Sequence, residues 1–320
     1  MNRILKRKRG VRRLWILPAA AAGIGAAAVC GIYRYVFYSP IGKQNDDYHI
    51  LAPIRTQEEY DRSIALIDAL NARPFERVHI RSDDGLRLAG RYYHTADGAP
   101  LAILCHGYRG TPSRDFCGGA DICFQAGYNV LLIEERAHCS SEGHTITFGV
   151  RERCDVLAWI NFALGRFGPE TRILLAGISM GAATVLMASE LALPQNVRGI
   201  LADCPYTSPE EIIREVGKAR GIPMQPAFPL VKLGARVLGG FSLTSASAVT
   251  AVRHAQVPIL LIHGEADDFV PCEMSRVIAQ ANPEMIERHT FPDAGHGLSY
   301  LVDTERYTGL VKAFCERIFP

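Results

Sequence analysis

The sequence lacks two features that mark common classes of binding protein: closely spaced cysteines and a basic body. None of its nine cysteines forms a C-x-x-C pair, which disfavours a structural zinc site. The first 13 residues hold seven basic side chains and no acids, whereas the remaining chain holds 28 basic and 33 acidic residues. A mildly acidic body offers no phosphate-binding surface, so nucleic acid is not expected as a partner.

Internal repeats and low-complexity segments are also missing, apart from one Ala-rich stretch near the N-terminus. Of the 320 residues, 48% are apolar and 21% are charged, which excludes a disordered chain and allows a large core. The eight cysteines beyond residue 38 are scattered and do not follow the spacing of a small disulfide scaffold. We expect them to be small core residues.

The basic N-terminus precedes Leu14–Tyr33, a run of twenty residues without a charge. A helix of that length spans a hydrocarbon core of about 30 Å. Trp15 at one end and the aromatic group of residues 35–38 at the other suit the two membrane interfaces. We therefore predict a basic cytoplasmic tail (1–13) and a single-pass anchor (14–38) in the cell membrane, with the body outside the cytoplasm. A cleaved signal peptide ending at Ala26–Ala28 is the alternative.

From residue 39 the pattern is that of a stalk, a helix and then an α/β domain. The predicted units are a stalk followed by a helix (together 39–74) and a domain (75–320) that carries an insertion (205–256). Thr56 and Glu59 form a capping box for the helix that follows the stalk. A turn at residues 83–85 predicts a hairpin, and buried strands are predicted at 101–105, 129–133, 172–176, 197–202, 257–262 and 286–291. Helices at 148–164, 180–193, 272–281 and 304–319 separate most of them, which predicts a mostly parallel sheet between two layers of helices.

The insertion contains two amphipathic stretches, 209–219 and 228–238, and no good strand. It follows the carboxyl end of a predicted strand, which is the edge where α/β sheets carry their sites. We therefore predict a small helical cap over the site.

A G-x-S-x-G sequence, Gly177–Gly181, lies between a predicted strand and a predicted helix. The two glycines permit a turn too tight for a Cβ, so that the Ser179 hydroxyl projects above the sheet. The sequence therefore predicts Ser179 as a nucleophile. The alternative is a glycine-rich turn whose serine has no catalytic role. It would leave the base and the acid described next without a function.

A nucleophilic serine needs a base, and the base needs a group that fixes its tautomer. His296 follows the last predicted strand, and Asp267 follows the strand before it. Parallel strands bring these positions to one edge of the sheet, which predicts a triad of Ser179, His296 and Asp267. Two other carboxylates stay open as the acid: the adjacent Asp268, and Asp203 at the end of the strand before the insertion.

Catalysis by such a triad also needs backbone N–H groups where negative charge develops. We predict the amide of Met180, directly after the nucleophile, and that of Tyr108, in the loop after strand 101–105. His106 in the same loop is interpreted as a structural histidine.

Four ordered motifs resemble the α/β-hydrolase superfamily over residues 75–320: His106-Gly107-Tyr108, the turn around Ser179, His263–Pro271 and Gly295–Gly297. The resemblance implies the α/β-hydrolase fold, with a mostly parallel sheet, helices on both faces and a small cap. Residues 134–143 are similar to the D-x-R-[GA]-H-G-x-S-x-G stretch of a membrane-associated bacterial branch that is described as esterase, lysophospholipase or acylaminoacyl-peptidase-like. Glu134 and Cys139 depart from that stretch, which puts substrate choice in doubt, whereas Arg136 and His138 are interpreted as loop-bracing residues.

The resemblance implies a serine hydrolase that cleaves carboxylic esters, including acyl lipids, through an acyl-enzyme. A serine exopeptidase on the same fold is the main alternative, and a membrane-tethered binding protein with an idle site is a weaker one. No cofactor and no metal are expected, because the oxyanion-binding amides supply the charge stabilisation. The expected partners are the membrane and a small-molecule or lipid acyl substrate.

Overall fold

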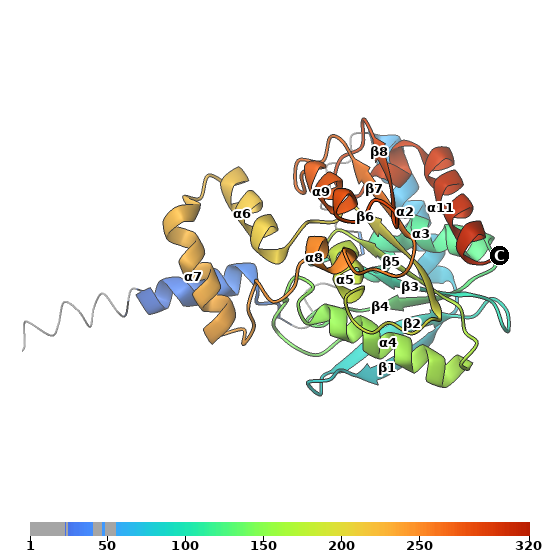
Figure 1. Ribbon diagram of the computed structural model, residues 1–320, viewed down its shortest axis with the longest axis horizontal. Helices are drawn as coiled ribbons and strands as arrows, with labels where there is room; N and C mark the ends of the chain where they lie inside the picture. Colours follow the sequence, from blue (N-terminus) through green and yellow to red (C-terminus); the bar gives the residue numbers. More distant parts are fainter. Residues whose placement is uncertain (1–22, 24, 41–46, 49–55) are drawn as a thin grey trace, which may run out of the picture.

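Eight strands form one sheet in the computed structural model, which describes residues 23, 25–40, 47–48 and 56–320. The strand order is β1-β2-β4-β3-β5-β6-β7-β8 (Figure 1). β2 pairs antiparallel with β1 and β4, and the other five pairings are parallel. The strands are β1 (Glu76–Arg81), β2 (Arg87–Tyr93), β3 (Leu101–Cys105), β4 (Asn129–Ile133), β5 (Ile173–Ile178), β6 (Val197–Asp203), β7 (Ile259–Gly264) and β8 (Ile286–Phe291). The ends of β3 to β8 lie within two residues of the predicted ones, and β1 and β2 flank the predicted hairpin turn, so the predicted sheet is confirmed.

The central strands are buried on both faces, which explains why they are continuous aliphatic runs and do not alternate with polar residues. Along β3, Leu101, Ile103 and Cys105 pack into one core, and Ala102 and Leu104 pack into the other. The sheet therefore separates two hydrophobic layers, each closed by helices.

The two layers of helices come from different parts of the chain (Figure 1). One face of the sheet carries α4 (Glu152–Phe167), α5 (Met180–Ala188), α8 (Ala248–Val252) and α9 (Glu273–Ala281). The other carries α2 (Gln57–Ala72), α3 (Pro112–Gln125), α10 (Ser299–Val302) and α11 (Thr304–Ile318). The capping box predicted for α2 is present, with the Thr56 side chain accepting from the Glu59 amide.

Three helices were not predicted, and one ends earlier than expected. α5 ends at Ala188, five residues before the predicted end at Leu193. No local pattern predicted α8 or α10, which are one turn long, or α3, which contains Gly118 and Gly119. A Cβ at Gly118 would lie 2.4 Å from the ring of Tyr300, so tertiary packing selects a glycine inside this helix.

The insertion after β6 forms a separate lobe with the N-terminal helix. Its two predicted helices are α6 (Pro209–Ala219) and α7 (Met224–Val237), whereas α8 returns to the body against α5. The helix of residues 25–36, hereafter the N-terminal helix, crosses α7 in this lobe, which projects from one side of the body (Figure 1). At the crossing, a Cβ on Gly234 would lie 3.4 Å from Tyr33 and 3.5 Å from the Val29 carbonyl oxygen.

The predicted membrane segment is only partly covered by the described residues. Half of Leu14–Tyr33, the basic tail and most of the predicted stalk lie outside them. Within the described part of the chain, no helix combines the length and the apolar character needed to cross a membrane. The aromatic end of the segment differs from the prediction: Phe37 is fully buried, and its ring packs edge-on against Phe148 and Phe241 and does not face a membrane interface.

Candidate active site

Ser179 occupies a sharp turn between β5 and α5. Its backbone has φ 55° and ψ −114°, a strained conformation for a residue with a Cβ, and its amide donates to the Asp203 carbonyl oxygen at 2.8 Å. The two glycines of the motif are required sterically. A Cβ on Gly177 would lie 2.3 Å from the Gly181 backbone, and a Cβ on Gly181 would lie 1.9 Å from the Cys105 carbonyl oxygen. This turn places the hydroxyl at the carboxyl edge of the sheet, as the sequence predicted.

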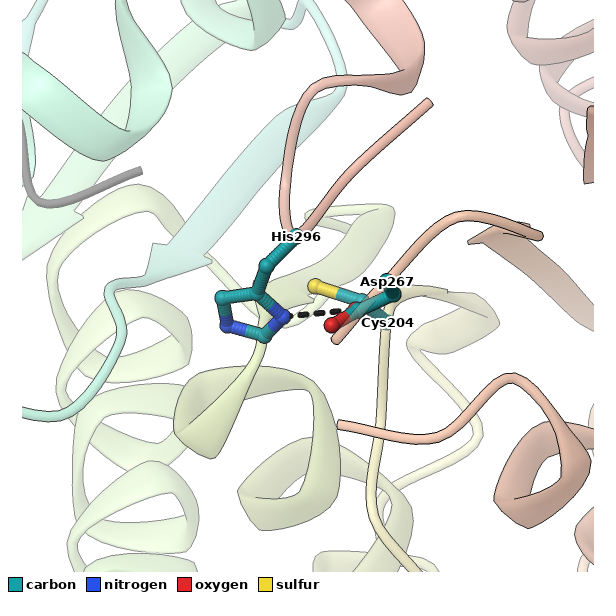
Figure 2. Close-up of side chains that lie close together, drawn as sticks. All are labelled: Cys204, Asp267 and His296. Atoms are coloured by element: carbon teal, nitrogen blue, oxygen red, sulfur yellow. Dashed lines mark hydrogen bonds and ion pairs between the residues drawn. The ribbon is translucent and has the colours of Figure 1, made fainter. Parts of the chain in front are cut away.

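His296 reaches this hydroxyl from the loop after β8. Its Nε2 lies 2.9 Å from Ser179 Oγ, and its Nδ1 lies 2.7 Å from Asp267 Oδ2 (the second contact is dashed in Figure 2). A carboxylate only accepts hydrogen bonds, so Nδ1 carries the proton and Nε2 is left to accept from the hydroxyl. The three predicted side chains are therefore joined in one hydrogen-bonded chain.

Asp267 follows β7, and its side chain is fully buried. Its Oδ1 accepts from the amides of Phe269 at 2.9 Å and Val270 at 2.8 Å, while His263 Nε2 lies 3.3 Å from Oδ2. Burial alone would raise the pKa of Asp267, but the hydrogen bonds from His263, His296 and the Val270 amide outweigh it and hold the pKa well below its usual value. The carboxylate is therefore ionised and fixed in orientation at neutral pH.

The two other candidate acids have different surroundings. Asp268 is exposed. Asp203 is buried, and its Oδ2 accepts from the Tyr307 hydroxyl at 3.1 Å. Burial raises the pKa of Asp203 to about 6. The carboxylate in contact with the imidazole is that of Asp267.

In the loop after β3, the backbone amides on either side of Tyr108 both donate hydrogen bonds. The Gly107 amide donates to Asp115 Oδ2 at 2.7 Å, and the Arg109 amide donates to His138 Nε2 at 3.0 Å. Gly107 adjoins the nucleophile, because a Cβ there would lie 3.4 Å from Ser179 Cβ. Met180 is the first residue of α5, where an amide has no acceptor within the helix. The roles of the Tyr108 and Met180 amides as oxyanion donors stay a prediction.

His106 and Arg136, which were interpreted from the sequence as structural residues, hold neighbouring loops together. His106 Nε2 accepts from the Glu135 amide at 3.1 Å, and its Nδ1 lies 2.9 Å from the Gly107 carbonyl oxygen. Arg136 makes two 2.6 Å hydrogen bonds to the buried carboxylate of Asp155. These contacts tie the loop after β4 to the loop after β3 and to α4.

The two departures from the family pattern also have structural explanations. Glu134 is buried, forms an ion pair with Arg77 and accepts from the Ser140 amide at 2.7 Å. Cys139 has φ 47°, in the left-handed region that favours glycine, which is the residue usual at this position in the related proteins. Both residues shape the loop after β4.

A buried thiol lies beside the triad. Figure 2 shows Cys204 next to Asp267 and His296, and the potential ligand atoms of the three residues lie within 4.8 Å of one another. The direct 2.7 Å contact between His296 and Asp267 leaves no room for an ion between them. Burial also raises the pKa of the Cys204 thiol well above its usual value, which disfavours the thiolate that a metal would need. All nine cysteines lie among the described residues, none of them forms a disulfide, and five of them are buried.

Two cavities meet at the nucleophile. One of about 510 Å³ includes His296 and Asp268 in its lining and extends toward α3 and α11. The other, of about 430 Å³, lies between the N-terminal helix, α6 and α7. Five residues line both cavities: Tyr108, Arg109, Ser179, Arg220 and Phe269. The Ser179 hydroxyl is therefore accessible from two sides.

Sequence reasoning missed three residues that complete the site. Asp115, in α3, holds the Gly107 amide, and no local pattern marks it. His263 was noticed within a motif but received no role, although it contacts Asp267. Cys204 follows β6 and has φ 47°, and its position beside the triad depends on the fold alone.

Comparisons with known proteins agree with this fold. A model of the alpha/beta hydrolase fold family matches residues 100–225. The uncharacterized protein YqkD of Bacillus subtilis is 23% identical over 304 residues, which cover 95% of this chain and 97% of YqkD. The esterase Pf2001 of Pyrococcus furiosus superposes with a TM-score of 0.65 at 22% identity, covering 78% of this chain and 93% of that one.

A peptidase shares the same architecture. The acylaminoacyl peptidase of Pyrococcus horikoshii superposes with a TM-score of 0.56 at 18% identity, covering 79% of this chain and 43% of that one. At these identities the likeness concerns the fold and not the substrate. With its mostly parallel sheet and the turn around Ser179, the chain has the α/β-hydrolase fold, and the family model of that fold matches it over residues 100–225.

Proposed function

We propose that this chain is a serine hydrolase that cleaves carboxylic esters. Ser179 is the nucleophile, His296 the general base and Asp267 the acid that orients the base. The observation that carries the proposal is the continuous hydrogen-bonded chain from Asp267 Oδ2 through both nitrogens of His296 to Ser179 Oγ. The same three groups in the same roles form the Ser-His-Asp triad of acyl-transfer enzymes.

The reaction proceeds through an acyl-enzyme. Ser179 Oγ attacks the ester carbonyl carbon, and its proton passes to His296 Nε2. The negative oxygen of the tetrahedral intermediate points to the amides of Met180 and Tyr108, each worth about 2.7–4 kcal/mol in such a site. His296 then gives its proton to the leaving alcohol, and a water activated by His296 releases the acid and frees Ser179.

Peptide bond cleavage is the alternative, because the acylaminoacyl peptidase of Pyrococcus horikoshii has the same fold. The esterase Pf2001 and other esterases share that fold as well, and an apolar cavity that reaches Ser179 supports an acyl ester. Rates on p-nitrophenyl esters and on aminoacyl-p-nitroanilides distinguish the two. We expect ester turnover to exceed anilide turnover by at least about 100-fold, since esters carry the better leaving group and the cavity suits an acyl chain. A higher rate on anilides would make the chain a peptidase.

The decisive variant is Ser179→Ala. It removes one oxygen atom and should abolish turnover of p-nitrophenyl butyrate while changing the unfolding midpoint little, because the strained backbone at residue 179 is kept. Ester turnover that survives in a folded Ser179→Ala protein would rule out this nucleophile, and a folded wild type without any turnover would favour an idle site.

We also propose that the segment of residues 14–38 attaches the protein to the cell membrane through its N-terminal part, whereas its C-terminal part packs on the catalytic body. Residues 1–13 would then lie in the cytoplasm and the catalytic body on the opposite side. The support is the charge pattern of the sequence: seven cations followed by twenty uncharged residues. Carbonate extraction of membranes tests the attachment, and protease digestion of intact spheroplasts tests the orientation. Release of the full-length chain by carbonate would contradict the anchor.

A further inference from the structure

The two cavities at Ser179 differ in their position relative to the base. The 510 Å³ cavity includes His296, Asp268 and Asp203 in its lining. The 430 Å³ cavity is lined mainly by aliphatic side chains, among them Ile32 and Val36 from the N-terminal helix, Ile213 and Val216 from α6, and Met224 and Val231 from α7. A general base that returns its proton to the leaving alcohol must face that alcohol. The cavity that contains His296 therefore suits the alcohol, and the aliphatic cavity suits the acyl group.

The two cations at the junction do not make the aliphatic cavity an anion site, because both are engaged with the N-terminal helix. Arg109 donates through one guanidinium nitrogen to the carbonyl oxygens of Tyr35 at 2.8 Å and Tyr38 at 3.3 Å. Arg220 donates to the Tyr35 hydroxyl. The arginines thus hold the wall of the cavity in place.

The N-terminal helix is fixed to the catalytic loop. The Tyr108 hydroxyl donates to the Val36 carbonyl oxygen at 2.8 Å, and the Tyr108 amide is a proposed oxyanion donor. Tyr33 Oη lies 2.6 Å from Thr145 Oγ1, and Phe37 is fully buried directly after the helix. The helix is therefore part of the folded site.

The rim of the cavity is open to solvent and apolar. Tyr35 and Ile222 both line the cavity, and both are exposed, at 56% and 39%. These exposed side chains mark the side of the cavity from which an acyl chain would enter.

From these observations we propose that the N-terminal helix is one wall of an acyl-chain site, so that the enzyme selects esters of medium or long fatty acids. The proposal rests on the proposed function, since it assigns the acyl side of the bond that Ser179 cleaves. It makes the segment around residue 31 a specificity determinant. Each methylene buried in the cavity should raise kcat/KM by roughly threefold to fourfold until the cavity is filled.

The test uses the full-length protein and monomeric p-nitrophenyl esters from acetate to decanoate. Gly31 lies on the cavity wall, and a Cβ built there meets nothing within 4 Å, so Gly31→Phe adds bulk to the wall without crowding at the Cβ atom. Gly25, on the same helix but outside the cavity lining, has equally open surroundings and provides the matched control, Gly25→Phe. Ala227→Phe adds bulk from α7, across the cavity.

Wild-type kcat/KM should rise with chain length by about 100-fold or more in total. Gly31→Phe and Ala227→Phe should each lower octanoate turnover by about tenfold or more and change acetate turnover by less than about threefold. Gly25→Phe should keep the wild-type profile at every chain length.

The outcomes separate the two proposals. A flat profile with turnover that still requires Ser179 would refute the acyl site and leave the proposed function intact. Loss of octanoate turnover in Ala227→Phe but not in Gly31→Phe would keep the cavity and refute the helix as its wall. No ester turnover at any chain length in the folded wild type would overturn the proposed function and the acyl site together.

Discussion

Replacing Asp267 by Asn exchanges one atom and should reverse the direction of the hydrogen bonds in the site. Oδ1 accepts from two backbone amides, so the carboxamide oxygen of Asn must take that place. The NH₂ group then occupies the position of Oδ2, 2.7 Å from His296 Nδ1. Two donors cannot face each other, so Nδ1 of His296 must become an acceptor and its proton must move to Nε2. A protonated Nε2 that faces the Ser179 hydroxyl cannot act as its base.

The size of the effect follows from the loss of that tautomer. Triad enzymes lose about 10⁴-fold in kcat when the orienting Asp becomes Asn, which corresponds to about 5 kcal/mol of transition-state stabilisation. The exchange also removes a buried, charge-assisted hydrogen bond, so we expect the free energy of unfolding to fall by about 1–3 kcal/mol. Steady-state kinetics on p-nitrophenyl butyrate and urea unfolding measure the two losses separately.

Two matched variants control this experiment. Asp268→Asn changes the adjacent, exposed carboxylate and should alter stability by no more than about 0.5 kcal/mol and the rate by less than about threefold. Asp203→Asn changes the other buried candidate, whose partner is Tyr307. Full activity of Asp267→Asn together with an inactive Asp203→Asn would show that the reasoning about the tautomer is wrong and that Asp203 orients the base.

Two further predictions concern the backbone turn and the pH dependence of stability. Gly181→Ala places a Cβ 1.9 Å from the Cys105 carbonyl oxygen and should lower the free energy of unfolding by more than about 3 kcal/mol. The control Gly165→Ala, in open surroundings on α4, should raise the free energy of unfolding by about 0.5–1 kcal/mol. Equal urea midpoints of the two variants would contradict the packing described for the turn. Burial raises the pKa of Asp203 to about 6, so the folded state holds this proton more tightly than the unfolded chain does, and the resulting stability is present below pH 4 and lost as the pH rises through 6. Relative to wild type, Asp203→Asn should therefore gain on the order of 2 kcal/mol in free energy of unfolding between pH 4 and pH 7.5, and a difference that does not change with pH would contradict the shift.

Much of the sheet and the candidate site could be predicted because both depend on local patterns that the fold only brings together. The buried strands are runs of aliphatic residues such as Leu101–Cys105, whose two faces are both covered. Ser179, Asp267 and His296 each follow a strand, and parallel strands place their carboxyl ends at one edge. The sequence favoured Asp267 as the acid but left Asp268 open, because the choice depends on which carboxylate the backbone amides of Phe269 and Val270 reach.

The role of the N-terminal helix could not be predicted, because its contacts join residues far apart in the sequence. An apolar helix that follows seven cations has the pattern of a membrane anchor whether or not one end also packs on the body. The partners of Phe37 are Phe148 and Phe241, more than a hundred residues away. The same reason applies to Asp115, whose carboxylate reaches the amide of Gly107 only after the loop and α3 have formed.

The central claim is that one serine hydroxyl, activated by one imidazole, carries the chemistry. Diethyl p-nitrophenyl phosphate tests it directly: a serine oxygen attacks phosphorus, p-nitrophenolate leaves, and the diethylphosphoryl group stays on the protein. We expect one equivalent of p-nitrophenolate per chain, a peptide adduct at Ser179 by mass spectrometry, and labelling at least about 1000-fold slower in His296→Ala. An adduct at another residue, or an unchanged labelling rate in His296→Ala, would contradict the account.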